Sequence, residues 1–206
     1  MAKAAVFLDR DGTLLEDVGY LDRLERLVFL PYTIDAVRLL NRAGFAVVVV
    51  TNQAGIARGI VQESFVSEAH RYIADRFAAG GARVDGFYYC PHHTDGIVEE
   101  FRRDCNCRKP KPGMLRRAAA DLDLGLDRSF AVGDRWHDLE AGQIFRESLP
   151  SAGGVARERH YALAPVQEQS RAPVADRTGD SENAMSSHRL EILPDSWHKA
   201  LLECGE

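Results

Sequence analysis

Two aspartates, Asp9 and Asp11, stand one residue apart directly after an apolar run at residues 4–8. The run predicts a buried strand, and residues i and i+2 of an extended chain project to the same side. The two carboxylates would then lie together, where they repel each other unless a proton or a cation sits between them. A hard ion such as Mg²⁺ suits such an oxygen pair. The alternative is that these residues form only a polar turn after a strand, and the other motifs of the chain distinguish the two interpretations.

Apolar runs and helical repeats alternate along the chain after this strand. A continuous β-branched run is typical of a strand that is buried on both faces of a parallel sheet. Repeats with helical spacing separate the runs, so we expect an α/β fold, a Rossmann-like parallel sheet sandwiched by helices. The expected strands are residues 4–8, 45–50, 84–89 and 129–132, and the expected helices are residues 33–43, 65–77 and 113–124, with a further helix beginning near Trp136.

Polar side chains follow every expected strand. Thr51 and Asn52 come after the second strand, Cys90 ends the third, and Asp134 comes after the fourth. Parallel strands end at one edge of a sheet, where open α/β sheets bind their ligands. This coincidence favours a functional site at the edge over an ordinary turn.

The chemistry that these residue types could perform is phosphoryl transfer. Asp9 could attack phosphorus as a nucleophile, while Asp11 could protonate the leaving oxygen and later take a proton from water. Asp134 could complete a metal site with Asp9 that neutralises the developing charge. Asp138, one helical turn further on, could hold a metal-bound water, or it could only cap its helix.

Donors for a phosphate group occur in two places. The Thr51 hydroxyl and the Asn52 backbone amide could donate hydrogen bonds to phosphate oxygens. Arg108, Lys109 and Lys111 precede an expected helix, and cations at a helix N-terminus make an anion site. One lysine could hold the transferred phosphoryl group. We assign no role to Lys111, which a solvated basic loop explains equally well.

Three of the four cysteines lie within 18 residues, and the fourth is Cys204. A C-x-H pair and, twelve residues later, a C-x-C pair supply three thiolates and one imidazole, a closed tetrahedral set for structural Zn²⁺. The zinc would clamp the loop at residues 90–107 and hold Arg108 and Lys109 against the sheet edge. A redox pair of cysteines is the alternative, and His93 could replace the neighbouring histidine. The expected ligands are Cys90, His92, Cys105 and Cys107.

The composition limits the possible partners. The chain has 206 residues, 45% of them apolar and 28% charged, which is typical of a globular protein with a real core. A net charge of −5 argues against a general nucleic-acid-binding surface and leaves room for a local basic pocket. No basic and apolar leader and no bilayer-spanning run occur, so we expect a cytoplasmic protein without a membrane partner. We expect a monomer.

These motifs resemble those of the haloacid dehalogenase superfamily of Mg²⁺-dependent phosphohydrolases, and within it the heptose bisphosphate phosphatases. The four superfamily motifs occur in order at residues 9–13, 51–53, 108–110 and 133–138, and the narrower resemblance adds residues 55–59, 89–93 and 105–110. It implies removal of the 7-phosphate of D-glycero-D-manno-heptose 1,7-bisphosphate through an aspartyl-phosphate, in nucleotide-activated heptose synthesis for lipopolysaccharide. A histidinol-phosphate phosphatase is one alternative, and a catalytically impaired relative that acts as a zinc-stabilised binding module is another.

The resemblance also implies roles for individual residues. Asp9 would be the nucleophile, Asp11 the acid and base, and Thr51 and Lys109 would steady the phosphoryl group. Mg²⁺ would be held by Asp9, by the backbone carbonyl of Asp11 and by Asp134, and the zinc loop would replace a larger cap domain. The expected substrate-binding residues are Asp17, Val18, Gly19, Tyr20, Asn52, Gln53, Ala54, Arg108 and Arg135.

The resemblance covers residues 3–142 and then stops. We expect a phosphatase core at residues 1–147 and an atypical, partly disordered tail at 148–206 with a short helix at 190–203. Residues 148–187 contain no β-branched run, so we expect an open sheet edge and lower stability than in relatives. The tail is either a lineage-specific extension or a frameshifted ending, and the coding DNA decides between the two.

Overall fold

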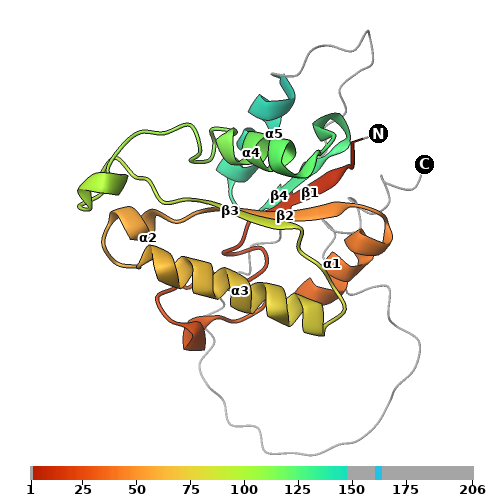
Figure 1. The fold of residues 1–206 in the computed structure, drawn as a ribbon, viewed down its shortest axis with the longest axis horizontal. Helices are drawn as coiled ribbons and strands as arrows, with labels where there is room; N and C mark the ends of the chain where they lie inside the picture. The colour runs from red at the N-terminus through yellow and green to blue at the C-terminus, as the bar shows by residue number, and fades with distance from the viewer. Residues whose placement is uncertain (1, 148–160, 164–206) are drawn as a thin grey trace, which may run out of the picture.

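A parallel β-sheet forms the centre of the protein. The computed structural model describes residues 2–147 and 161–163. Its five strands run in the order β3-β2-β1-β4-β5 (Figure 1). Their bounds are Ala5–Leu8 (β1), Ala46–Asn52 (β2), Gly86–Cys90 (β3), Phe130–Gly133 (β4) and Tyr161–Leu163 (β5). The expected parallel α/β architecture is confirmed.

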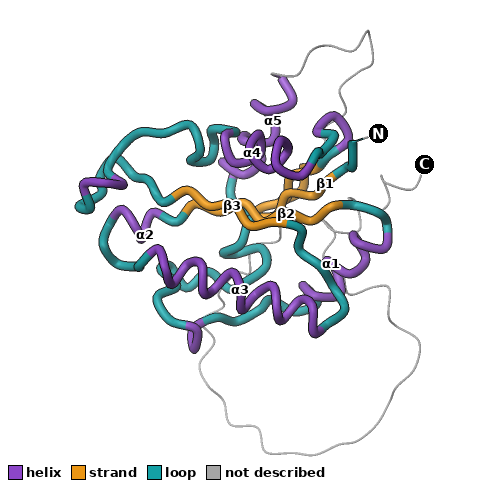
Figure 2. The backbone as a smooth tube through the Cα atoms, viewed as in Figure 1, coloured by secondary structure: helices purple, strands orange, loops and turns teal. Residues whose placement is uncertain are grey.

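Helices cover both faces of this sheet. The helices α1 (Thr33–Arg42) and α3 (Glu63–Ala79) lie on one face, and α4 (Gly113–Leu122) and α5 (Trp136–Glu147) lie on the other (Figures 1 and 2). The short helices are α2 (Ala54–Ala57), η1 (Leu24–Arg26), η2 (Glu99–Phe101) and η3 (Leu126–Arg128). Within the described residues, no helix combines the length and the apolar character needed to cross a membrane.

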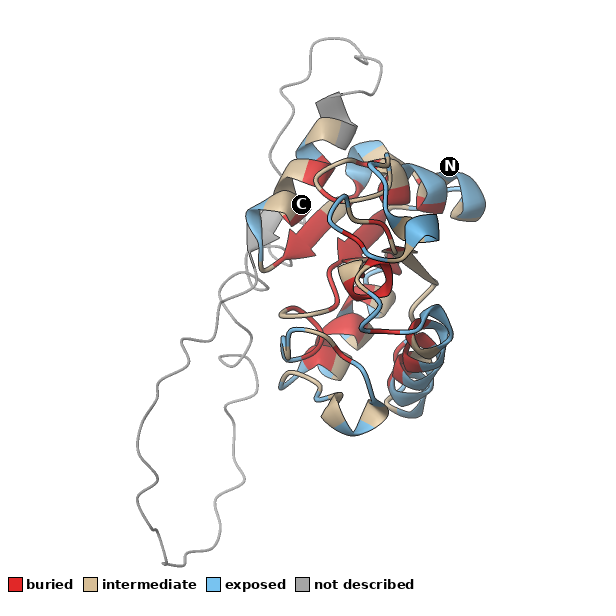
Figure 3. Cartoon of the chain, turned by 90° about the vertical axis from the view of Figure 1, so that its left-hand side faces the viewer, coloured by how far each residue is buried: buried red, intermediate tan, exposed pale blue. Residues whose placement is uncertain are grey.

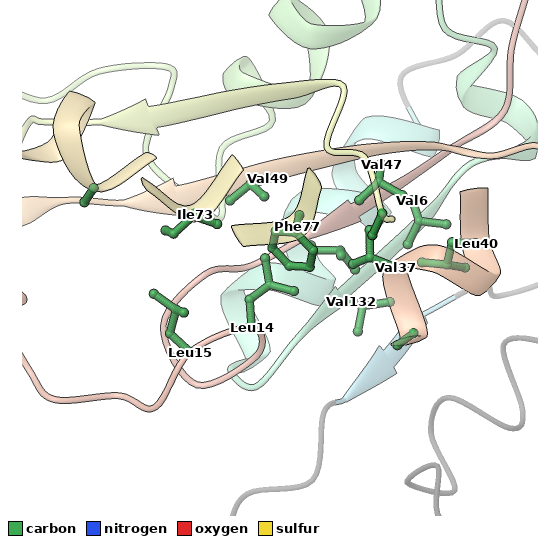
Figure 4. Packing of buried hydrophobic residues seen from close by; sticks show 14 of the residues in the cluster. Val6, Leu14, Leu15, Val37, Leu40, Val47, Val49, Ile73, Phe77 and Val132 are labelled. Atoms are coloured by element: carbon green, nitrogen blue, oxygen red, sulfur yellow. The ribbon is translucent and has the colours of Figure 1, made fainter. Parts of the chain in front are cut away.

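Alternation along the central strands divides the core into two layers. Val47 and Val49 of β2 face α1 and α3, where they meet Val37, Ile73 and Phe77 (Figure 4). The intervening residues of β2 pack on the other face against α4. The strands β1, β2 and β4 are buried along almost their whole length (Figure 3), which explains the continuous apolar runs. Both layers hold the strand ends, and the polar residues that follow them, in fixed positions.

The sheet edge beside β4 corrects one expectation. No strand was predicted in residues 148–187, yet β5 pairs in parallel with β4, with Val132 opposite Ala162. Three residues are too few for a strand pattern to register in the sequence, and the pairing uses backbone groups that any residue offers. The helix expected at 190–203 and the rest of the tail lie outside the described residues.

Candidate active site

Three carboxylates meet at the carboxyl edge of the sheet. Asp9 follows β1, Asp134 follows β4, and Asp138 lies in the first turn of α5. Their oxygens lie within 4.8 Å of one another. The pairing of β1 with β4 continues into this cluster, because the Asp9 backbone amide donates to the carbonyl of Val132 at 2.9 Å. The sheet therefore brings Asp9 together with Asp134 and Asp138, which lie 125 and 129 residues further along the chain.

The Lys109 ammonium group lies between two of these carboxylates. It is 2.6 Å from Asp9 Oδ1 and 2.7 Å from Asp138 Oδ1, and it donates to the Val50 carbonyl at 2.6 Å. Burial lowers the pKa of Lys109, but the two carboxylates outweigh it, so the net shift is upward and the amine stays charged. Burial raises the pKa of Asp9 to about 7 against the opposing attraction of Lys109. The cluster therefore has a surplus of carboxyl groups, three around one ammonium group, and ionising all three is unfavourable without a further cation.

This surplus makes the cluster fit a hard divalent cation. Asp134 Oδ1 is buried without a hydrogen-bond partner in the described part of the chain, and burial raises the pKa of Asp134. The loop after β1 approaches closely because Gly12 adopts a φ of +88° and has no side chain. A Cβ at residue 12 would lie 2.4 Å from Asp134 Oδ2. An oxygen-only donor set of this kind suits Mg²⁺.

Two neighbouring side chains hold the carboxylate of Asp11. Its carboxylate accepts from Arg10 through Nε at 3.0 Å and Nη2 at 2.9 Å, and from Gln53 Nε2 at 3.0 Å. β1 ends at Leu8, and the charge of Asp11 lies close enough to contribute to the raised pKa of Asp9. Asp138, rather than the Asp11 side chain, completes the carboxylate cluster. Asp9 thus contacts Lys109, whereas Asp11 is held by Arg10 and Gln53.

Thr51 and Asn52 hold neighbouring parts of the site in place. The Thr51 hydroxyl is buried and accepts a hydrogen bond from Gln53 Nε2 at 2.8 Å. The Asn52 side chain pairs with both backbone groups of Lys109, accepting from its amide at 3.0 Å and donating to its carbonyl at 3.1 Å. Asn52 thus fixes the lysine as well as lining the cavity.

A cavity of about 380 Å³ opens above the carboxylates, a size that suits a small phosphorylated molecule. Among the expected substrate-binding residues, Val18 does not line this cavity and instead packs against the apolar core. Lys109 and Asp134 do not line the cavity themselves but lie close to Asp9, which does. The lining residues that the sequence analysis proposed are Asp9, Asp11, Asp17, Gly19, Tyr20, Thr51, Asn52, Gln53, Ala54, Arg108 and Arg135.

Gly55, Arg58 and His137 also line the cavity and were not assigned to the site. Arg58 follows α2 and donates to the Tyr20 hydroxyl, while its Nη2 lies 3.4 Å from His93 Nε2. Its signal was present, since it belongs to the segment 55–59 that carried the narrower resemblance. His137 likewise belongs to the fourth motif, residues 133–138, although no role was assigned to it there.

Positive charge gathers on the rim around Arg58 and Arg108. In residues 2–147 neither guanidinium group has a carboxylate partner, whereas Arg135 is paired with Asp17. Burial and the two guanidinium groups lower the pKa of His93, which lies beside them. The rim therefore offers unbalanced positive charge to a second anionic group on a substrate.

The cysteine and histidine side chains converge as expected. The Sγ atoms of Cys90, Cys105 and Cys107 and the Nδ1 atom of His92 lie 3.2 to 3.7 Å from their neighbours. Ligands about 2.3 Å from a tetrahedral Zn²⁺ are roughly 3.7 Å apart, so the four atoms need only a small adjustment. The sulfur contacts are far longer than a disulfide bond of about 2.05 Å. The expected ligand set fits zinc, with His92 rather than His93 in the fourth position.

Backbone hydrogen bonds join the zinc loop to the segment that carries Arg58. The loop connects β3 to α4 and is mostly irregular (Figure 2). The amides of Ile97 and Val98 both donate to the carbonyl of Ala57, at 2.8 and 2.9 Å. The loop therefore packs against the segment that carries Arg58. The chain continues directly from the loop into Arg108 and Lys109.

The chain is similar to characterised families and structures. A HAD-hydrolase-like family model matches residues 106–145. The D-glycero-beta-D-manno-heptose-1,7-bisphosphate 7-phosphatase of Escherichia coli K12 is 47% identical over 143 residues, 68% of this chain and 75% of that protein. Its namesake from Pasteurella multocida is 45% identical over 174 residues, 81% of this chain and 94% of that protein. The Pasteurella match thus covers more of the chain than residues 3–142, where the resemblance was expected to stop.

Two solved structures share the fold. A HAD-like phosphatase from Mesorhizobium loti has a TM-score of 0.67 and 39% identity, covering 70% of this chain and 69% of its own. The D,D-heptose 1,7-bisphosphate phosphatase of B. bronchiseptica, complexed with magnesium and phosphate, has a TM-score of 0.60 and 34% identity, covering 67% and 74%. The chain therefore belongs to the D-glycero-beta-D-manno-heptose-1,7-bisphosphate 7-phosphatase family of HAD-like phosphatases.

Proposed function

We propose that this protein removes the 7-phosphate of D-glycero-D-manno-heptose 1,7-bisphosphate in a Mg²⁺-dependent reaction. The carrying observation is the buried Asp9 beside Lys109, at the floor of a cavity whose rim holds unbalanced arginines. The names of the relatives support the substrate. The proposal includes the cytoplasmic location, the monomeric state, the role in lipopolysaccharide synthesis and the phosphatase core at residues 1–147.

In the first half of the reaction, an Asp9 carboxylate oxygen attacks phosphorus and forms the aspartyl-phosphate while the bond to the sugar oxygen breaks. The carboxyl group of Asp11 gives its proton to that leaving oxygen. The Lys109 ammonium group and the Thr51 hydroxyl stabilise the charge on the transferring group. Mg²⁺ held by Asp9, the Asp11 carbonyl and Asp134 would neutralise charge on the phosphoryl oxygens.

The second half reverses the proton movement. The Asp11 carboxylate takes a proton from a water molecule as the water oxygen bonds to phosphorus. The bond between phosphorus and the Asp9 oxygen breaks, which releases inorganic phosphate and regenerates the carboxylate. This step also restores the proton of the Asp11 carboxyl group, and Arg10 and Gln53, which donate to its oxygens, keep the group close to both steps.

The rim favours a bisphosphate over histidinol phosphate. The leaving group of histidinol phosphate carries an ammonium group, which would meet the unbalanced guanidinium groups of Arg58 and Arg108. The leaving group of heptose 1,7-bisphosphate carries a phosphate dianion, which these arginines would attract. The carboxylate of Asp17 offers little compensation for an ammonium group, because it already pairs with Arg135.

A catalytically impaired binding module is harder to reconcile with the site. The nucleophile, the lysine and the carboxylate cluster are all buried in mutual contact, and such a concentration of charge is costly to maintain without a use. The zinc loop also leads directly into the catalytic lysine. The arrangement supports an active enzyme.

Phosphate release from heptose 1,7-bisphosphate and from histidinol phosphate, each with and without Mg²⁺, tests the proposal. We expect Mg²⁺-dependent release with at least tenfold higher kcat/KM for the bisphosphate. A preference for histidinol phosphate would overturn the proposed identity of the substrate. Activity unaffected by removal of Mg²⁺ would overturn the metal requirement.

A further inference from the structure

One buried histidine is not used by the proposed reaction. His70 lies on α3 and is only 6% exposed. Its Nε2 atom is 3.4 Å from Nη1 of Arg10, within hydrogen-bonding distance. Arg10 is itself 1% exposed and holds the Asp11 carboxylate through Nε and Nη2. A continuous chain of polar contacts thus leads from α3 to the residue proposed to move protons.

The chemistry of this contact fixes the state of the histidine. A guanidinium group can only donate, so His70 Nε2 has to accept, which places the single ring proton of a neutral imidazole on Nδ1. Burial and the charge of Arg10 lower the pKa of His70 to about 3, in agreement with a neutral ring. The ring is also held mechanically, since it stacks on Phe87 with centroids 4.8 Å apart and meets the edge of Tyr89 at 5.7 Å.

We propose that His70 is a positioning residue for the proton transfers of Asp11. The Arg10 guanidinium group is planar and binds Asp11 at two points, so the plane of the arginine sets the plane of the carboxylate. His70, on α3, contacts the remaining nitrogen, Nη1, and so helps to fix the orientation of the guanidinium plane. The inference rests on the proposed role of Asp11. It concerns proton delivery and leaves the identity of the sugar open.

Two substitutions at His70 distinguish the contribution of its hydrogen-bond acceptor from that of its flat ring. His70→Phe keeps a flat ring for stacking on Phe87 and removes the acceptor, whereas His70→Gln keeps an acceptor oxygen. We expect His70→Phe to lower kcat/KM for heptose bisphosphate by roughly 10- to 100-fold, because misplacement of a catalytic group by about 1 Å can cost about 10² in rate. His70→Gln should recover most of this loss.

A second substrate distinguishes positioning from simple damage to the fold. p-Nitrophenyl phosphate releases a phenolate that needs no proton, and kcat/KM reports only the steps up to bond cleavage. We expect His70→Phe to change kcat/KM for this substrate by no more than about twofold. Equal losses on both substrates, full activity of His70→Phe, or failure of His70→Gln to recover activity would each overturn the proposal.

Arg10→Lys provides an independent check if His70→Phe does not fold. Lysine contacts a carboxylate as a point charge, so it should give the same selective loss on the sugar phosphate. If the wild-type enzyme prefers histidinol phosphate, the comparison is repeated with that alkyl phosphate. The heptose proposal would then have failed while the role of His70 is still tested.

Discussion

The sheet edge and the zinc loop position functional groups by different means. At the sheet edge, Asp9 and Asp134 follow paired strands whose register is fixed by backbone hydrogen bonds and by two apolar layers. The zinc loop contains little regular structure, and four side chains around one point hold it together. The first arrangement depends on the whole core, whereas the second depends on one ion.

This difference matches what each region supplies. The edge provides the buried groups that we propose to attack and stabilise the phosphoryl group, and such groups need positions accurate to about half an ångström. The loop supports Arg58 and Arg108, which lie on the rim of the cavity and which we propose to bind the second phosphate. Lys109 links the two, because it follows the loop and binds Asp9. Damage to the loop should therefore change substrate recognition first and chemistry second.

The largest effect should come from the sheet edge. Asp9→Asn removes the nucleophile, so we expect kcat to fall by roughly 10⁴-fold or more while the protein stays folded, since the asparagine is nearly the same size. Steady-state phosphate release measures the loss, and trapping of phosphoenzyme should fail. An Asp9→Asn protein with full activity would show that another group attacks phosphorus.

Loss of the zinc should have a smaller and more local effect. Cys105→Ser combined with Cys107→Ser should abolish the bound zinc, about one ion per chain, and lower kcat/KM by roughly 10- to 100-fold. Amide hydrogen exchange should rise across residues 90–107 and stay slow in β2. Cys204→Ser is the matched control, since Cys204 is not one of the proposed ligands. Unchanged exchange in the metal-free loop would contradict a structural role for zinc.

Acid should lower the free energy of unfolding of the protein through His70. Its folded pKa of about 3 lies below the ordinary value of 6.5, so the unfolded chain binds the proton first. This contribution to stability is complete above about pH 6.5 and is lost progressively as the pH falls towards 3. Between pH 7 and pH 5 we expect a loss of about 2 kcal/mol that is absent from His70→Gln. Urea unfolding of both proteins measures it, and identical pH profiles would count against a buried neutral ring.

The smallest effect should come from the rim. Arg58→Ala removes one unbalanced cation, so KM for heptose 1,7-bisphosphate should rise about tenfold with little change in kcat, the size expected for one charge-assisted hydrogen bond. Heptose 7-phosphate, which lacks the second phosphate, should be much less affected. Arg102→Ala, an exposed loop residue outside the cavity, is the control. An equal rise in KM for both sugars would place Arg58 near the sugar ring instead.

The sequence was most informative where function and regular structure coincide. The strand ends carrying Asp9, Thr51 and Asp134 could be found because continuous apolar runs stop abruptly at polar residues. The zinc ligands could be found because their spacing is short and their residue types are unusual. Local patterns sufficed in both cases.

Other features depend on tertiary contacts that no local pattern records. The hold on Asp11 comes from Arg10 and Gln53, and Arg10 in turn contacts His70 on α3. The contact of Arg58 with the rim arises from the loop that packs on Ala57. Likewise, β5 forms through backbone pairing with β4, and the side chains of its three residues carry no pattern that predicts this pairing.

Gly12 shows how a residue without a functional group can limit sequence variation. Its backbone crosses so near Asp134 that a methyl group would displace the carboxylate, and its φ of +88° already disfavours other residues. A saturation library at position 12 should therefore return essentially glycine codons among active clones. The same library at Arg102, an exposed loop residue outside the cavity, should tolerate many replacements. Part of the sequence constraint at the catalytic edge therefore comes from a position where no side chain fits beside Asp134.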